Sequence, residues 1–127
     1  LFPEEEFQFE VPSPELKLNV DRTQIEQILI NLLKNAREAC SRKSDKKIQV
    51  KARKLSAGNT TLTISDNGEG ILPDVLDKIF VPFFTTKTSG SGIGLSLCKQ
   101  IMTLHEGSIN VKSEVGKGSS FILTFPK

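Results

Sequence analysis

Apolar and polar residues alternate in several short segments of the chain. Alternation over about four to eight residues is typical of a strand with one buried face. Two such segments lie on either side of Pro12-Ser13-Pro14 and predict a hairpin-like edge. Two further pairs are joined by turns that contain glycine. The strands predicted in this way span residues 7–11, 16–20, 48–55, 60–65, 108–113 and 119–125.

A helical period identifies a long helix over residues 22–42. Asp21 precedes it and Gln24 follows three residues later, which is the arrangement of an N-terminal capping box. At about 100° per residue, the apolar side chains form one stripe, and a polar band lies along one edge of that stripe. The stripe contains Ile25, Ile28, Leu29, Leu32, Ala36 and Ala39, and the band contains Gln24, Gln27, Asn31, Asn35 and Glu38.

Two other helices are predicted in the second half of the chain. Pro73 suits the first turn of a short helix that ends near Phe80. Residues 81–91 show no period and are rich in Thr, Ser, Gly and Lys, which predicts a mobile loop. A longer helix over residues 92–104 then carries apolar residues on one side, namely Ile93, Leu97, Ile101 and Leu104.

Helices and strands therefore come in blocks, and the strands are joined largely by hairpins. This order favours a two-layer α/β sandwich over a doubly wound parallel sheet. We expect a mixed, mainly antiparallel sheet covered on one face by helices.

A length of 127 residues allows one domain, residues 1–127, with a single core. Because the chain begins at Leu1 rather than Met, we expect it to be excised from a longer protein.

No apolar run approaches the roughly 20 residues of a membrane span, so we expect no membrane contact by this domain. Cys40 and Cys98 lack the spacing of metal ligands, which favours buried free thiols in a reducing compartment.

The charge of the chain does not predict a nucleic-acid partner. The formal net charge is only +2. Basic residues gather between residues 42 and 54, where the long helix ends, and cations there suit the helix dipole. No aromatic residue lies among them, and Trp and Tyr are absent from the chain.

The segment Asp66-Asn67-Gly68-Glu69-Gly70-Ile71 follows directly after a predicted strand. A carboxylate acceptor beside glycines, which permit close approach of the backbone, suits recognition of a flat ring with an exocyclic amine. An ordinary turn has a similar composition, so this segment alone leaves both interpretations open.

Amides, glycines and aromatic residues elsewhere favour a nucleotide site. Asn31 and Asn35 are neighbours one turn apart on the long helix. Phe80, Phe83 and Phe84 flank the polar loop that carries Lys87. The segment 90–95, Gly-Ser-Gly-Ile-Gly-Leu, precedes a helix whose positive end can face phosphate oxygens, although its spacing fits neither a Rossmann nor a Walker motif.

Taken in order, the segments 31–36, 66–71, 80–87 and 90–95 resemble the N, G1, F and G2 boxes of a known family. The family is the catalytic ATP-binding domain of sensor histidine kinases, within the wider GHKL superfamily of Bergerat ATPases. The resemblance extends over roughly residues 7–126. It implies a Bergerat fold with a mobile ATP lid.

The resemblance also implies ligands and roles. ATP and Mg²⁺ are the expected ligands, Asn35 is the metal-binding residue, and Asn31, Asn35 and Lys87 are the catalytic residues. GHKL members that hydrolyse ATP carry a Glu at the position of Asn31, where it acts as a base that activates water. The amide of Asn31 cannot accept a proton in this way. Glu38 stands where many histidine kinases have Lys or Arg, so the cation that supports the triphosphate from this helix stays open. The implied nucleotide-binding residues are Asn31, Asn35, Glu38, Asp66, Gly68, Gly70, Ile71, Phe80, Lys87, Gly90, Ser91, Gly92, Gly94, Leu95 and Ser119, with Ser120 as an alternative to Ser119.

The implied function is transfer of the γ-phosphoryl group of Mg·ATP to a histidine on a separate, helical dimerisation domain of the same longer chain. A response-regulator receiver domain would act downstream, and the domain would be cytoplasmic. Two alternatives are an ATP-binding module of a degenerate sensor without transfer, and a GHKL serine kinase of the anti-sigma type. His105, the only histidine, lies between a helix and a strand, where we expect a structural turn rather than a phosphoacceptor.

Overall fold

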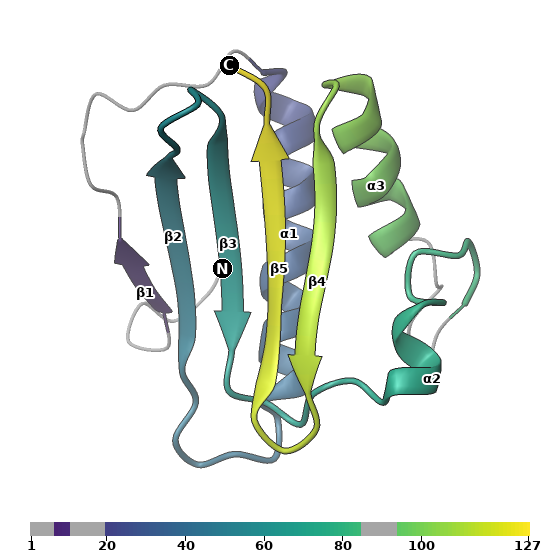
Figure 1. The fold of residues 1–127 in the computed structure, drawn as a ribbon. Coiled ribbons are helices and arrows are strands. Elements are labelled where there is room, and N and C mark those ends of the chain that lie inside the picture. Colours follow the sequence, from purple (N-terminus) through teal and green to yellow (C-terminus); the bar gives the residue numbers. More distant parts are fainter. Residues whose placement is uncertain (1–6, 11–19, 85–93) are drawn as a thin grey trace.

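The computed structural model describes residues 7–10, 20–84 and 94–127, with side chains from residue 20 onward. The described elements follow one another from the N-terminus to the C-terminus as shown in Figure 1. They are β1 (Phe7–Glu10), α1 (Arg22–Ala39), β2 (Ile48–Lys54), β3 (Thr60–Asp66), α2 (Pro73–Leu76), α3 (Gly94–Leu104), β4 (Ser108–Glu114) and β5 (Gly118–Phe125).

The five described strands form one sheet in the order β1-β2-β3-β5-β4. β1 pairs with β2 in parallel, and the other neighbours pair antiparallel. Both long helices, α1 and α3, lie on the same face of this sheet (Figure 1). The fold is therefore the expected two-layer α/β sandwich with a mixed, mainly antiparallel sheet.

The edge strand β1 differs in part from the predicted hairpin. Its described partner is β2, which runs parallel to it. The second predicted strand of that hairpin, residues 16–20, lies outside the described residues except for Val20, which is in a bend.

α1 begins where the capping box predicts. Asp21 accepts a hydrogen bond from the backbone N–H of Gln24 through Oδ1 at 3.0 Å. The helix ends at Ala39, three residues before the predicted end at Arg42, and the backbone N–H of Cys40 still donates to the Ala36 carbonyl at 3.1 Å. Cys40 is fully buried and packs with Ala36 and Ile48.

The core lies between the sheet and the two long helices. α1 contributes Ile28 and Leu32, and the sheet contributes Ile64, Leu123 and Phe125, all almost without exposed surface. Full burial of one such side chain stabilises a fold by about 1.5–3 kcal/mol. The apolar stripe predicted for α1 is confirmed, with Ile25, Ile28, Leu32 and Ala36 buried.

The predicted apolar side of α3 was wrong at one end. Leu104 is 72% exposed, whereas Cys98 and Met102 are fully buried. The buried side of α3 is rotated by about a quarter turn from the predicted stripe. Leu104 is the last residue of the helix, and the chain then reverses at Glu106, which has a φ of 58°.

His105 holds the end of α3 against the start of α1. Its Nε2 accepts a hydrogen bond from the backbone N–H of Asp21 at 3.0 Å, and its Nδ1 lies 2.8 Å from the carbonyl oxygen of Ile101. Nδ1 therefore carries the proton, because a carbonyl can only accept. This geometry confirms a structural role in the turn.

Candidate functional site

Asp66 is the last residue of β3 and lies at one end of the site. Its Oδ1 accepts a hydrogen bond from the backbone N–H of Gly68 at 2.9 Å. Burial raises the pKa of the Asp66 carboxyl group above its ordinary value, and the backbone N–H groups of Gly68 and Ser119 partly offset this effect. The result is an acceptor that is partly withdrawn from water and held in one orientation.

The glycines after Asp66 let this segment pack closely against its neighbours. A Cβ on Gly68 would lie 2.5 Å from the carbonyl oxygen of Ala39. Gly70 has a φ of +77°, and a Cβ there would lie 2.4 Å from the carbonyl oxygen of Glu114. Side chains are excluded from both positions, so the backbone of the predicted G1 box is wedged between the end of α1 and the end of β4.

Asn67 fixes the other side of this segment and was not among the predicted site residues. Its Oδ1 accepts from the backbone N–H of Lys47 at 2.8 Å, and its Nδ2 donates to the Asp45 carbonyl at 2.7 Å. The Cys40 thiol also donates to Oδ1 at 3.4 Å. No local sequence signal identifies this role, because the two backbone partners of Asn67 lie 20 and 22 residues away in the chain.

The structure distinguishes Ser119 from Ser120. Asp66 and Ser119 are paired in register across β3 and β5, so their side chains lie on the same face. Ser120 projects to the opposite face, where its Oγ lies 2.8 Å from the Oγ of Ser65. The hydroxyl group that accompanies Asp66 is therefore that of Ser119, which is 6% exposed.

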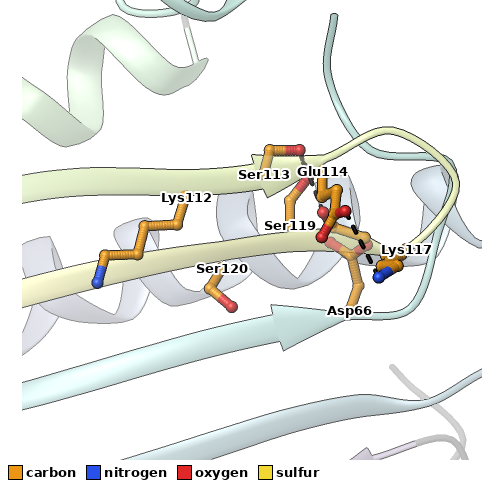
Figure 2. A pocket seen from close by; sticks show the side chains of 8 residues that line it. Asp66, Lys112, Ser113, Glu114, Lys117, Ser119 and Ser120 are labelled. Atoms are coloured by element: carbon orange, nitrogen blue, oxygen red, sulfur yellow. Dashed lines mark hydrogen bonds and ion pairs between the residues drawn. The ribbon is translucent and has the colours of Figure 1, made fainter. Parts of the chain in front are cut away.

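An open hollow of about 340 Å³ lies at the turn between β4 and β5, and residues from both faces of the sheet line it, Lys112 and Ser120 among them. Figure 2 shows Asp66 and Ser119 in its wall, close to Ser113, with the ion pair between Glu114 and Lys117 at the turn. That ion pair measures 3.5 Å between Nζ and Oε1. Because both partners are largely exposed, it contributes little to stability.

The amide band of α1 lies beside the start of α3. A Cβ built on Gly94 would lie 3.7 Å from Cγ of Asn31, and Asn31 Nδ2 lies 3.9 Å from the Cys98 sulfur. Burial raises the pKa of Cys98 to about 11, so this thiol stays protonated. Asn35, one turn further along α1, is half-buried. The fold thus brings the predicted N box together with the helix that follows the G2 box.

The other predicted site residues occupy different positions. Ile71 and Leu95 are partly buried against the core. Phe80 packs edge-to-face on Phe121 with 6.5 Å between ring centroids. Glu38 is exposed on α1. Lys87, Gly90, Ser91 and Gly92 lie outside the described residues, as does most of the predicted lid.

The chemistry of the site suits a nucleotide. Asp66 offers an acceptor for an amine, and the amide oxygens of Asn31 and Asn35 are hard donors of the kind Mg²⁺ prefers. Among residues 20–84 and 94–127, no three His, Cys, Asp or Glu side chains gather as a metal-binding group. In the same part of the chain, no helix is long and apolar enough to cross a membrane.

Comparison with known proteins gives the family. The sequence profile described as "Histidine kinase-, DNA gyrase B-, and HSP90-like ATPase" matches residues 20–127. The chain belongs to this family. It is also 39% identical over 110 residues to the sensor histidine kinase ZraS of Salmonella typhimurium, a match that covers 87% of this chain and 23% of that protein. The chain thus spans about a quarter of the length of this relative.

Solved structures agree with this membership. The catalytic domain of the histidine kinase ThkA superposes with a TM-score of 0.83 and 38% identity, covering 95% of this chain and 78% of that one. ThkA has also been solved in complex with the response regulator protein TrrA, with a TM-score of 0.75 and 33% identity, covering 95% and 34%. Full-length ShkA in complex with AMPPNP has a TM-score of 0.82 and 26% identity, covering 96% and 26%. The chain is a catalytic ATP-binding domain of the sensor histidine kinase type.

Proposed function

We propose that this chain binds Mg·ATP and delivers the γ-phosphoryl group to a histidine on a separate helical dimerisation domain. The observation that carries the proposal is the position of Asn31, on the flank of α1 that meets the start of α3. An amide there cannot take a proton from water, so the site presents ATP to an external nucleophile.

The adenine end of the site consists of Asp66, the segment 68–71 and Ser119. Asp66 accepts from the exocyclic amine, and Gly68 and Gly70 allow the backbone to approach the ring. Ile71, partly buried against the core, packs against the base. Ser119 adds its hydroxyl group on the same face as Asp66.

The phosphate end consists of Asn31, Asn35 and Gly94. Asn35 would hold Mg²⁺ through its amide oxygen, and the ion would supply positive charge beside the phosphate oxygens. The start of α3 at Gly94 directs backbone N–H groups toward the same oxygens. Lys87, Gly90, Ser91 and Gly92 would close over the triphosphate, with Phe80 and Leu95 at the base of the lid.

The transfer step exchanges one bond to phosphorus for another. The bond between the γ-phosphorus and the bridging oxygen of ADP breaks, and a bond from an imidazole nitrogen to that phosphorus forms. The domain contributes positioning and charge neutralisation, and the histidine comes from its partner domain. Glu38 occupies a position where a cation would assist, and Lys87 would add positive charge at the phosphate end from outside this helix.

The partners follow from the relatives. ZraS is longer than this chain, so the dimerisation domain is proposed in the same longer protein. ThkA binds a response regulator, and we propose a receiver domain as the downstream acceptor here. The two described cysteines are free and buried, which suits a cytoplasmic, reducing environment.

Labelling with γ-³²P-ATP tests the transfer. The chain alone should neither hydrolyse ATP at a useful rate nor label itself, and His105→Gln should change neither result. Addition of the helical domain should produce acid-labile, base-stable label on a histidine of that domain. Label on a serine of a partner would favour the anti-sigma type, and ATP binding without any label would favour a degenerate sensor. Rapid hydrolysis by the chain alone would contradict the role given to Asn31.

Calorimetric titration tests the binding site separately. Asp66→Ala should weaken ATP by at least about tenfold, because hydrogen bonds to charged groups contribute about 1.5–3 kcal/mol. Ser65→Ala, one residue earlier and on the other face of the sheet, is the control. Equal ATP affinities for Asp66→Ala and the unchanged chain would remove the adenine-acceptor role.

A further inference from the structure

Ser113, near the end of β4, makes three short contacts with the adenine end of the site. Its Oγ accepts from the backbone N–H of Ile71 at 2.8 Å and donates to the carbonyl oxygen of Gly118 at 3.1 Å. The same Oγ lies 2.8 Å from the Oγ of Ser119. Figure 2 shows the two hydroxyl groups side by side, next to Asp66. No local sequence pattern selects Ser113, because its contact with Ile71 joins residues 42 positions apart in the chain.

Counting protons gives the direction of the bond between the two serines. A serine hydroxyl has one hydrogen and can accept two hydrogen bonds. The Ile71 N–H can only donate and the Gly118 carbonyl can only accept. If Ser113 gives its hydrogen to Gly118, its remaining lone pair must accept from Ser119, and all three contacts are made. If Ser113 gives its hydrogen to Ser119 instead, the contact with Gly118 is lost. The first arrangement makes one more hydrogen bond.

This direction has a consequence for ligand recognition. With its only hydrogen directed to Ser113, Ser119 presents lone pairs beside Asp66, which is itself an acceptor. Two acceptors side by side favour the N–H groups of an exocyclic amine. They disfavour an oxo group at the same ring position, because it also carries only lone pairs.

We propose that Ser113 is a positioning residue that fixes the hydroxyl of Ser119 as an acceptor and so enforces the choice of 6-amino over 6-oxo purine nucleotides. This inference rests on the proposed nucleotide function. In Ser113→Ala the hydroxyl of Ser119 is released, can rotate, and can donate to an oxo group. The specificity of the site would therefore depend on a residue that does not itself touch the base.

The test is competition binding with Mg²⁺, in which ATP, ITP and the triphosphate of unsubstituted purine riboside displace a ribose-labelled ATP analogue. Ser113→Ala should lower the preference for ATP over ITP by about fivefold, the value of one net hydrogen bond. Ser113→Thr keeps the hydroxyl group and should therefore keep the preference for ATP over ITP seen in the unchanged chain. Ser65→Ala removes a bond of the same type and length, 2.8 Å, on the opposite face and should leave the preference unchanged.

A purely structural role predicts a different pattern, in which all three nucleotides weaken by the same factor, and that result would overturn the proposal. If Ser113→Ala does not fold, Ser113→Cys serves instead, because a thiol is a poor acceptor and would also release Ser119. In a Ser119→Ala background, Ser113→Ala should have no further effect on the preference, and a persisting effect would refute action through Ser119. Failure of the unchanged chain to bind ATP would instead refute the proposed function.

Discussion

The two ends of the candidate site are built in different ways. The adenine end is held by backbone: Gly68 and Gly70 pack against carbonyl groups, and Asn67 bonds to main-chain groups of the loop after α1. The phosphate end is held by side chains on two separate helices, with Asn31 of α1 facing Gly94 and Cys98 of α3. The adenine end therefore depends on exact chain geometry, whereas the phosphate end depends on how two helices pack.

This difference suits the two parts of Mg·ATP, the proposed ligand. A flat, rigid base is recognised by acceptors in fixed positions, and tight backbone packing at Gly68 and Gly70 holds in place the segment that follows the Asp66 acceptor. A triphosphate with its metal ion is charged and flexible, and amides and helix ends can adapt to it. The comparison predicts that substitutions at the adenine end change stability and specificity together, and that those at the phosphate end change binding alone.

The largest effect is expected at Gly70. Gly70→Ala should lower the free energy of unfolding by more than about 3 kcal/mol, through backbone strain and overlap with Glu114. Gly116→Ala is a matched control, because its φ of +82° resembles the +77° of Gly70 but no atom lies within 4 Å of its Cβ. The control should lose only about 1 kcal/mol. Urea unfolding measures the free energy of unfolding of both variants. Equal losses would show that the close packing of Gly70 against Glu114 does not contribute to stability.

The features that the sequence predicted well are local. Asp21 with Gln24 marks the start of α1 because a cap needs only neighbouring residues. The alternation over residues 119–125 predicts a strand with one buried face, and Phe121, Leu123 and Phe125 of β5 are buried. The predicted α/β sandwich is confirmed because its blocks of strands and helices can be recognised without knowing their contacts.

The features that could not be predicted depend on contacts between distant segments. The alternation of side chains along β5 does not show whether Ser119 or Ser120 lies beside Asp66, because the register between β3 and β5 decides this. The exposure of Leu104 depends on how α3 rotates against the sheet. The contacts of Ser113 join residues 42 positions apart in one case, so no local pattern contains them. The roles of the individual site residues stay predictions.

The next effect concerns the phosphate end. Asn35→Ala should weaken ATP binding in the presence of Mg²⁺ by about tenfold, and the mutant should gain no affinity when Mg²⁺ is added. ADP without metal should bind almost as before, and the unfolding free energy should change little. Gln27→Ala, an exposed amide on the same band of α1, is the control. If Mg²⁺ still strengthens ATP binding by the mutant as in the unchanged chain, the metal ligand lies elsewhere.

A smaller effect links stability to pH at Asp66. Burial raises the pKa of Asp66 above its ordinary value of 3.8, so the folded chain holds this proton more tightly than the unfolded chain. The ionised carboxylate therefore costs stability, a cost that is absent below pH 3.8 and grows as pH rises through the folded pKa. Asp66→Asn should unfold at higher urea concentration than the unchanged chain at pH 7, and this advantage should shrink toward acidic pH.

The same variant should bind ATP less tightly, so stability and binding should change in opposite directions. Asp45→Asn is the control, because that side chain is 81% exposed. A gain in stability that is independent of pH would show that burial of the Asp66 charge is not its cause.

The smallest effects distinguish the two buried thiols, which contact different ends of the site. Cys98 lies against Asn31 and Cys40 donates to Asn67, and neither has exposed surface. Replacing either with Ala should cost stability, because each fills part of the core. Only Cys98→Ala should release Asn31. Because that contact is weak at 3.9 Å, ATP affinity should fall about twofold while AMP affinity stays unchanged.

Cys40→Ala should affect ATP and AMP alike, because AMP also occupies the adenine end. Titration of ATP and AMP against both variants gives four affinities. If the two ends of the site are built independently, only Cys98→Ala should weaken ATP binding relative to AMP binding. If both variants weaken ATP relative to AMP by the same factor, the two ends of the site are coupled through the core and are not built independently.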